Sequence, residues 1–111
     1  MPEKKEYQNI LTELRRGSLT MAVLALLRKP HYGYALLQTM EGVGIDMEAN
    51  TLYPLLRRLE SQGLLKSDWD TTESRPRKYY EISTQGYEVL QMLLKELERI
   101  QSSMDKIIED L

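Results

Sequence analysis

The sequence predicts a mostly α-helical fold with one small β-hairpin, and three observations lead to this fold class. Apolar residues recur at helical spacing in the first half of the chain, most densely between residues 10 and 27. The stretch "RKYYEIS" at 77–83 is rich in β-forming residues and follows the turn-like segment "DTTESRP". The final stretch, 85–111, carries an apolar repeat whose steps alternate between three and four residues.

Length and composition exclude several classes of protein. The 111 residues suit one domain, there is no cysteine, and His31 is the only histidine, so the sequence offers no disulfide, thiolate metal site or imidazole cluster. No nucleotide-binding or catalytic motif is present, and we expect neither an enzyme nor a cofactor. His31 is expected to be a plain surface residue in a loop. No apolar run approaches the ~20 residues of a membrane span, and "MPEKKEYQN" has no signal-peptide core, so a cytoplasmic protein without a membrane partner is expected.

Two helices are predicted before residue 45. The first is long and ends before Pro30, with the pair Gly17 and Ser18 as a candidate break. The second is expected from about Gly33 through "YALLQTME", closed by the glycines at 42 and 44.

A third helix is predicted in "NTLYPLLRRLESQGLL", residues 50–65. Its four leucines fall within about 100° on a helical wheel and are expected to face the core: Leu52, Leu55, Leu56 and Leu59. The opposite face carries Asn50, Pro54, Arg57 and Ser61. Because proline is tolerated in the first turn of a helix, Pro54 places the helix start near Asn50 or Thr51. The free N–H groups and positive dipole end at that start suit a phosphate or a base edge.

A hairpin is predicted from "LLKSDW" and "RKYYEIS", and a last helix follows it with Thr84 as the expected N-cap. The period of a strand places Arg77 and Tyr79 on one face and Lys78, Tyr80 and Ile82 on the other. We expect Arg77 to meet DNA phosphates and Tyr80 to close the edge of the core.

Three helices, a hairpin and a long helix form the order of a winged helix-turn-helix, in which the third helix enters a DNA major groove. The net charge is only −2, but "RPRK" at 75–78 concentrates three cations, whereas 88–111 holds six acids and three bases. An amphipathic helix with outward arginines is also common as a plain solvated face. A winged helix that serves as a protein-interaction module is the alternative function, and salt-sensitive affinity for duplex DNA would separate the two.

The last helix carries a heptad stripe that needs a facing surface: Leu90, Leu93, Leu97, Ile100, Met104, Ile107 and Leu111. Packing against the first helix is one explanation, but a helix of about 40 Å would outrun the small winged core. We therefore favour a homodimer in which this helix meets its counterpart or the partner's first helix. Residues 1–84 then form the DNA-binding domain and 85–111 the long C-terminal dimerisation helix, and two recognition helices about 34 Å apart read a two-fold symmetric site.

Three stretches in order, "LRRGSLTMAVLALLRKPHYGYALLQTM", "NTLYPLLRRLESQGLL" and "RPRKYYEISTQGYEVL", cover most of the chain. Together they resemble the PadR family of bacterial transcriptional regulators, in its short form with a single C-terminal helix. The resemblance implies a homodimeric DNA-binding regulator, most often a repressor. It places Thr51, Tyr53, Pro54 and Arg57 in or beside the groove, and Arg75, Arg77 and Lys78 in the wing.

Two further residues match the "YGY" of the family at the start of the second helix. Tyr32 is as well suited to phosphate contact as to packing around Gly33, whereas packing is favoured for Tyr34. Tyr32 and Asn50 complete the predicted double-stranded DNA contacts. The wing tip departs from the family pattern, because "TTESRPRK" has no glycine and places Glu73 beside the cations.

The resemblance also implies that some members of the family respond to a small hydrophobic or aromatic effector. In this chain no aromatic residue follows Tyr87, and Met92 and Met104 are the only adaptable side chains of the last helix.

Overall fold

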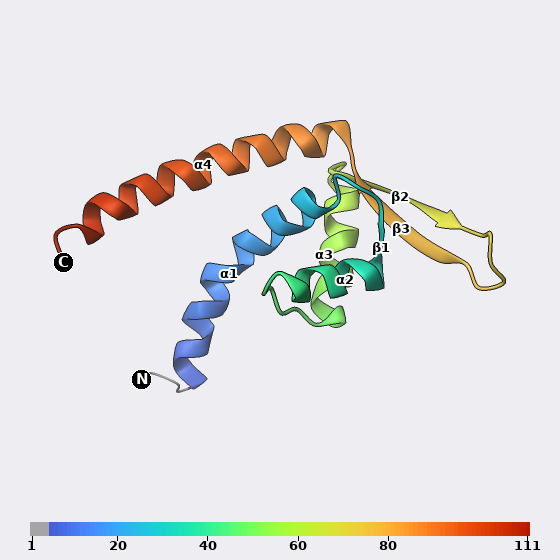
Figure 1. Cartoon of the computed structure of the whole chain (residues 1–111), viewed down its shortest axis with the longest axis horizontal. Coiled ribbons are helices and arrows are strands. Elements are labelled where there is room, and N and C mark those ends of the chain that lie inside the picture. The colour runs from blue at the N-terminus through green and yellow to red at the C-terminus, as the bar shows by residue number, and fades with distance from the viewer. Residues whose placement is uncertain (1–4) are drawn as a thin grey trace.

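The computed structural model describes residues 5–111 and confirms the predicted fold class (Figure 1). Four helices and a three-stranded antiparallel sheet follow one another as α1 Lys5–Leu26, β1 His31–Tyr32, α2 Gly33–Gly42, α3 Ala49–Ser61, β2 Leu65–Asp70, β3 Arg77–Ile82 and α4 Thr84–Ile108. The N-terminal segment "MPEKKEYQN" was expected to have no signal-peptide core. Its first four residues, 1–4, lie outside the described residues. Between residues 5 and 111, no helix combines the length and the apolar character needed to cross a membrane.

Helix α1 runs without interruption through Gly17 and Ser18, so a break at this pair is not found. Gly17 is exposed, and no atom of residues 5–111 would come within 4 Å of an added Cβ there. A glycine in such a place weakens a helix by about 1 kcal/mol relative to alanine but keeps its hydrogen bonds. The helix ends before Pro30, as predicted, and only its last part is buried, at Val23 and Leu24.

The loop predicted around His31 is instead strand β1, which adds a third strand to the hairpin. His31 pairs with Tyr80 and Tyr32 with Tyr79, so β3 lies in the middle of the sheet order β1-β3-β2. His31 is half-buried, and its Nδ1 lies 2.8 Å from the carbonyl oxygen of Lys29. A strand of two residues has no periodicity to detect, and it exists because β3 supplies a free edge for it.

Helix α3 begins earlier than predicted. The N–H groups of Thr51 and Leu52 both donate to the carbonyl oxygen of Glu48, 3.0 Å away, so Ala49 is the first helical residue. Pro54 therefore lies in the second turn and not in the first. Its missing N–H leaves one carbonyl without an intrahelical donor, and water can satisfy this carbonyl because Pro54 is on the exposed face. The four leucines are buried and the opposite face is exposed, as predicted.

The N-cap of α4 is Ser83 and not Thr84. The Ser83 hydroxyl accepts from the Gly86 N–H at 2.9 Å and donates to the carbonyl of Gly63 at 2.7 Å. Thr84 is instead the first residue of the helix. The cap therefore joins the start of α4 to the turn that follows α3.

One core joins α1, α2, α3, the sheet and the start of α4: Val23, Leu24, Leu27, Leu36, Met40, Leu52, Leu55, Leu56, Leu59, Leu65, Tyr80 and Leu90. The predicted core position of Tyr80 is confirmed. Leu90, which the sequence assigned to the dimer stripe, is buried in this core and does not belong to the exposed part of that stripe.

Helices α1 and α4 leave the core as two diverging arms (Figure 1). They make the Cα radius of gyration 16.5 Å, whereas a compact domain of this length has about 13 Å. Beyond Leu93, the side chains of α4 are exposed. The long helix therefore extends past the chain's own core.

Candidate nucleic-acid interface

The outward face of α3 presents polar and cationic groups without internal partners. Asn50, Thr51, Pro54 and Arg57 are all exposed. Within residues 5–111, the Arg57 guanidinium makes no hydrogen bond or ion pair. The buried leucines dock the helix from behind, so Arg57 is held at the surface with all five of its N–H donors available.

Tyr53 lies on the side of α3 that meets α2, and it is half-buried. A Cβ built on Gly33 would lie 2.5 Å from Cε1 of Tyr53 and 2.9 Å from its hydroxyl oxygen. Only glycine permits this approach. Tyr53 therefore packs against the start of α2, in addition to its predicted place beside the groove. The role of Gly33 was not predicted, although its place in "YGY" at a helix start was the available signal.

The two tyrosines beside Gly33 differ in their surroundings. Tyr34 is 65% exposed, so its predicted packing in the core is wrong. Helix α2 buries Gly33, Leu36 and Met40, at steps of three and four residues, and Tyr34 falls outside that stripe. Tyr32 precedes the helix, is half-buried, and donates its hydroxyl hydrogen to the carboxylate of Asp70.

The wing is the hairpin formed by β2, β3 and residues 71–76 between them. Asp70, the last residue of β2, organises the outer end of this hairpin, where the strands meet the connecting segment. Its Oδ2 accepts from Tyr32, and its Oδ1 accepts from the backbone N–H of Thr72 at 3.0 Å and from the Thr72 hydroxyl at 2.7 Å. The bond from Tyr32, followed by those from Thr72, lowers the pKa of Asp70 from 3.8 to about 2. The same bond to Asp70 raises the pKa of Tyr32. This network was not predicted, although an aspartate two residues before a threonine in a turn is a common local motif.

Replacing Tyr32 by phenylalanine is expected to move the pKa of Asp70 upward, towards its usual value of 3.8. The bond stabilises the ionised carboxylate, so its contribution to stability is complete above pH 3.8 and is lost as the pH falls towards 2. A pH titration of the carboxyl carbon by NMR measures the change. Thr72→Val, which keeps the backbone N–H, should produce a smaller rise. An unchanged pKa in Tyr32→Phe would show that the hydroxyl does not bind Asp70.

Arg77 lies over the ring of Tyr32. Its Cζ is 4.1 Å from the ring centroid, and its Nη2 is 3.7 Å from Oε1 of Glu73. The ring holds the guanidinium by a cation–π contact, and the side chain remains 47% exposed. The guanidinium of Arg77 is thus accessible to a phosphate, but it already pairs with Glu73 from the wing tip.

Lys78 is the most enclosed of the three cations that the sequence predicts as wing contacts. Its Nζ lies 3.7 Å from Oε1 of Glu60 on α3, and it stands 5.4 Å from the ring centroid of Tyr80 and 5.9 Å from that of Trp69. Glu60 also accepts a hydrogen bond from the hydroxyl of Ser67 on β2. Lys78 therefore joins the wing to α3 in the free protein, a role that the sequence did not indicate.

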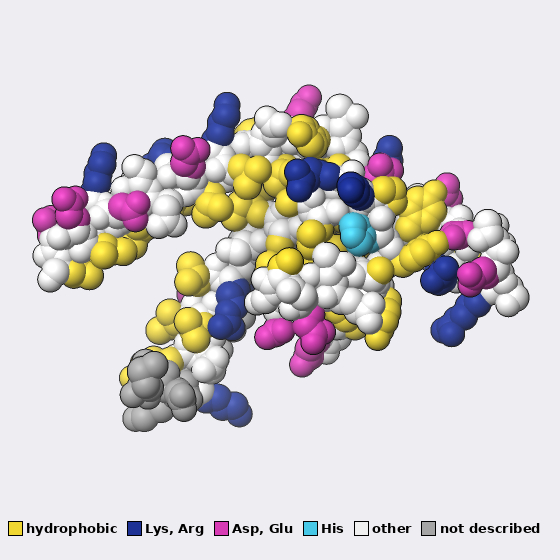
Figure 2. All heavy atoms as spheres, in the orientation of Figure 1, with side chains coloured by type: hydrophobic (Ala, Val, Ile, Leu, Met, Phe, Trp, Pro, Cys, Tyr) yellow, Lys and Arg dark blue, Asp and Glu magenta, His cyan; other side chains and the backbone are white. Residues whose placement is uncertain are grey.

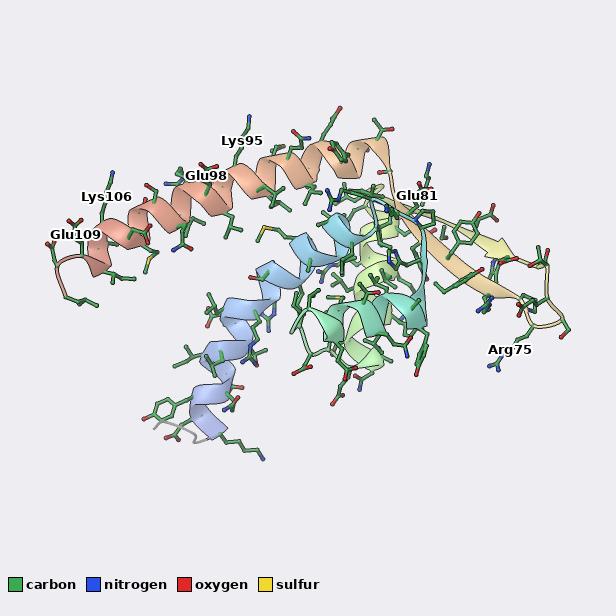
Figure 3. The ribbon with its side chains drawn as sticks, in the orientation of Figure 1. Arg75, Glu81, Lys95, Glu98, Lys106 and Glu109 are labelled. Carbon is green, nitrogen blue, oxygen red and sulfur yellow. The ribbon has the colours of Figure 1, made fainter. Side chains whose placement is uncertain are left out.

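Arg75 projects into solvent from the tip of the wing (Figure 3). Among the described residues it has no hydrogen-bond or ion-pair partner. Figure 2 shows cationic side chains gathered with acidic ones at this end of the molecule. Arg57 and Arg75 are thus the predicted cations that carry no anion within residues 5–111.

The comparisons with known proteins match this arrangement. The model of the transcriptional regulator PadR-like family matches residues 23–92, from the end of α1 to the first turns of α4. The chain belongs to the PadR-like family. This family match confirms the resemblance seen in the sequence, and the protein is a PadR-like transcriptional regulator with a winged helix.

Several solved structures resemble this PadR-like chain over most of its length. A PadR family transcriptional regulator from Eggerthella lenta DSM 2243 is 47% identical with a TM-score of 0.85, and the alignment covers 96% of this chain and 98% of that one. A PadR-like transcription factor from Bacteroides fragilis is 31% identical with a TM-score of 0.76, over 89% and 98%. A Streptococcus transcriptional regulator is 30% identical with a TM-score of 0.78, over 86% and 97%. No curated protein sequence matches the chain.

Proposed function

We propose that this PadR-like regulator is a cytoplasmic, sequence-specific repressor that binds a two-fold symmetric DNA operator as a homodimer. The observation that carries the proposal is that Arg57, exposed on the outward face of α3, has no hydrogen-bond or ion-pair partner among residues 5–111, and that the cationic wing adjoins this helix. In this arrangement α3 reads bases in the major groove, and the wing contacts the phosphate backbone.

The contacts divide between reading and positioning. Arg57 has the geometry to donate two hydrogen bonds to one guanine edge, because nothing within the described chain holds its guanidinium. Asn50 and Thr51 lie in the first turn of α3, where the positive end of the helix dipole favours a phosphate or a base edge. Thr51 can contribute only its side chain there, because its N–H already donates to the carbonyl oxygen of Glu48. Arg75 and Arg77 supply the wing contacts, and Lys78 keeps the wing against α3.

Dimerisation is proposed through the exposed stripe of α4. Leu97, Ile100, Met104 and Ile107 are between 42% and 61% exposed in the single chain. The neighbouring arm α1 exposes Ile10 at 63% and Leu14 at 74%. Figure 2 shows apolar side chains along the facing edges of both arms. A second copy that inserts its own α4 would cover these surfaces, and this supports 1–84 as the DNA-binding domain and 85–111 as the dimerisation helix.

The proposal includes a small hydrophobic or aromatic effector that binds beside this stripe. Met104 lies on the stripe and is 42% exposed. Met92 is 68% exposed, but twelve residues at about 100° each place it on another face of the helix. An effector site that uses both methionines would therefore need residues from two copies. Such a ligand would change operator affinity by linkage with dimerisation.

Arginine-to-alanine variants test the division between α3 and the wing. Arg57→Ala is expected to cost about 1 to 3 kcal/mol on the preferred operator and much less on random duplex, because only the operator offers the matching guanine. Arg77→Ala should weaken binding to both duplexes alike and reduce the salt slope by about one ion. Fluorescence anisotropy titrations on both duplexes at several salt concentrations measure these effects.

The matched control is Arg58, which adjoins Arg57 on α3 and is also exposed. Arg58→Ala should leave the preference for the operator unchanged. If Arg57→Ala were equally indifferent to sequence, α3 would bind phosphates only, and the sequence-reading residue would have to be sought at Asn50, Thr51 or Tyr53. Binding without salt dependence would favour a protein-interaction module instead.

A further inference from the structure

The guanidinium of Arg77 lies at the surface of the wing, where the ring of Tyr32 holds it and the carboxylate of Glu73 lies beside it. Tyr32 is fixed by its hydrogen bond to Asp70, and Arg77 lies over the fixed ring with its Cζ 4.1 Å from the centroid. Glu73, from the segment between β2 and β3, brings its Oε1 to 3.7 Å from Nη2 of Arg77. The cation is therefore held in place on one side and neutralised on the other.

We propose that Glu73 occupies, in the free protein, the place on Arg77 that a DNA phosphate takes in the complex, so that binding exchanges an internal anion for an external one. This inference rests on the proposed function, because it assumes that Arg77 contacts phosphate. A carboxylate and a phosphate accept hydrogen bonds from a guanidinium in the same way. Glu73 thus acts as an internal competitor of the DNA backbone.

The two acids near Arg77 have different tasks. Both oxygens of Asp70 are occupied by Tyr32 and Thr72, and these bonds build the wing. Within residues 5–111, the side chain of Glu73 makes no hydrogen bond and no ion pair other than the one with Arg77, and it is 68% exposed. Glu73 can therefore leave without disturbing the fold, whereas Asp70 cannot.

The exchange lowers the affinity of the wing for every duplex by the same factor, since Arg77 meets the backbone and not the bases. Exposed ion pairs of this kind are weak, so the effect is a modest one of about two- to fivefold. The consequence is a wing that holds random DNA less tightly, while Arg57 on α3 supplies the preference for the operator.

The test compares Glu73→Gln with wild type, in the full-length protein, on random duplex and on the operator. Glu73→Gln is expected to tighten binding about threefold on both duplexes and to steepen the salt slope by up to about one ion. The matched control is Asp68→Asn, which removes a charge from an exposed residue of β2 that has no cationic partner among the described residues. The amide oxygen of the asparagine can still accept the bond that Asp68 receives from the backbone N–H of Trp69. This control should change the affinity for either duplex by less than about 1.5-fold.

The double variant Glu73→Gln, Arg77→Gln separates the proposed exchange from a general charge effect. If Glu73 acts through Arg77, the double variant binds no more tightly than Arg77→Gln alone. A threefold gain that persists in the Arg77→Gln background, or that Asp68→Asn reproduces, would overturn the inference. If Arg77→Gln binds both duplexes as wild type does, the wing contact of the proposed function fails together with the inference. If Arg77→Gln weakens binding and Glu73→Gln changes nothing, only the inference fails.

Discussion

Gly86→Ala is expected to lower the free energy of unfolding by about 3 kcal/mol, because a side chain at this position collides with backbone. An added Cβ would lie 2.0 Å from the carbonyl oxygen of Leu64 and 2.9 Å from Cγ1 of Ile82. The Leu64 oxygen cannot withdraw freely, since it accepts the N–H of Ser83 at 3.0 Å. Urea denaturation followed by circular dichroism measures the loss.

Gly17→Ala is the matched control for this prediction. Gly17 also lies inside a helix, but an added Cβ would meet no atom of the described chain within 4 Å. Alanine there should stabilise the protein by about 0.5 to 1 kcal/mol, through the higher helix propensity of alanine. A Gly86→Ala variant as stable as wild type would show that the first turn of α4 does not press against the turn after α3.

Met104→Asp is expected to dissociate the proposed dimer at micromolar concentration. Met104 lies in the middle of the exposed α4 stripe, and an unpaired charge in an apolar seam costs about 3 kcal/mol or more. Because Met104 is already 42% exposed in the single chain, the fold of each copy should survive the change. Sedimentation velocity, with circular dichroism as the check on folding, measures both outcomes. Ile107→Asp, which changes the next residue of the stripe, should have the same effect.

The control for the dimer prediction is Ser102→Asp. Residue 102 is exposed and lies on the side of α4 opposite to the stripe, at about 100° per residue, so the same charge should leave the dimer intact. Unchanged dimers in both Met104→Asp and Ile107→Asp would remove α4 from the interface. In that case the repeat in the last helix would serve only as a solvated arm, and another surface would have to join the two copies.

Much of this fold could be predicted from the sequence because each helix or strand shows its buried face in its own repeat. The leucines of α3 are buried, and Arg57 is exposed on the other side, because the period of 3.6 residues leaves one arrangement of that segment. Tyr80 is buried and Arg77 exposed by the same logic at the period of a strand. Helix boundaries were less accurate. Ser83 caps α4 while its hydroxyl also bonds to the distant Gly63, and α3 begins at Ala49 without a side-chain cap that would mark its start.

Several positions could not be predicted, since they depend on segments distant in the sequence. Strand β1 exists only where β3 offers an edge, and Tyr34 faces solvent because α2 is short and buries the side that carries Leu36 and Met40. The contact of Tyr53 with Gly33 joins residues 20 positions apart. The hydrogen bond from Tyr32 to Asp70 joins residues 38 positions apart. No local pattern contains the information for such pairs.

By itself, the sequence determined the winged helix-turn-helix order, the leucine face of α3, the family resemblance and the presence of cations at 75–78, since each is written in local spacing or composition. Only the tertiary structure decided what those cations do. Arg75 is free of partners in the described chain, Arg77 stands between Tyr32 and Glu73, and Lys78 is tied to Glu60. The reason is physical: a charge is recognised from its residue type, but its availability depends on which anions and rings the fold brings within a few ångströms of it.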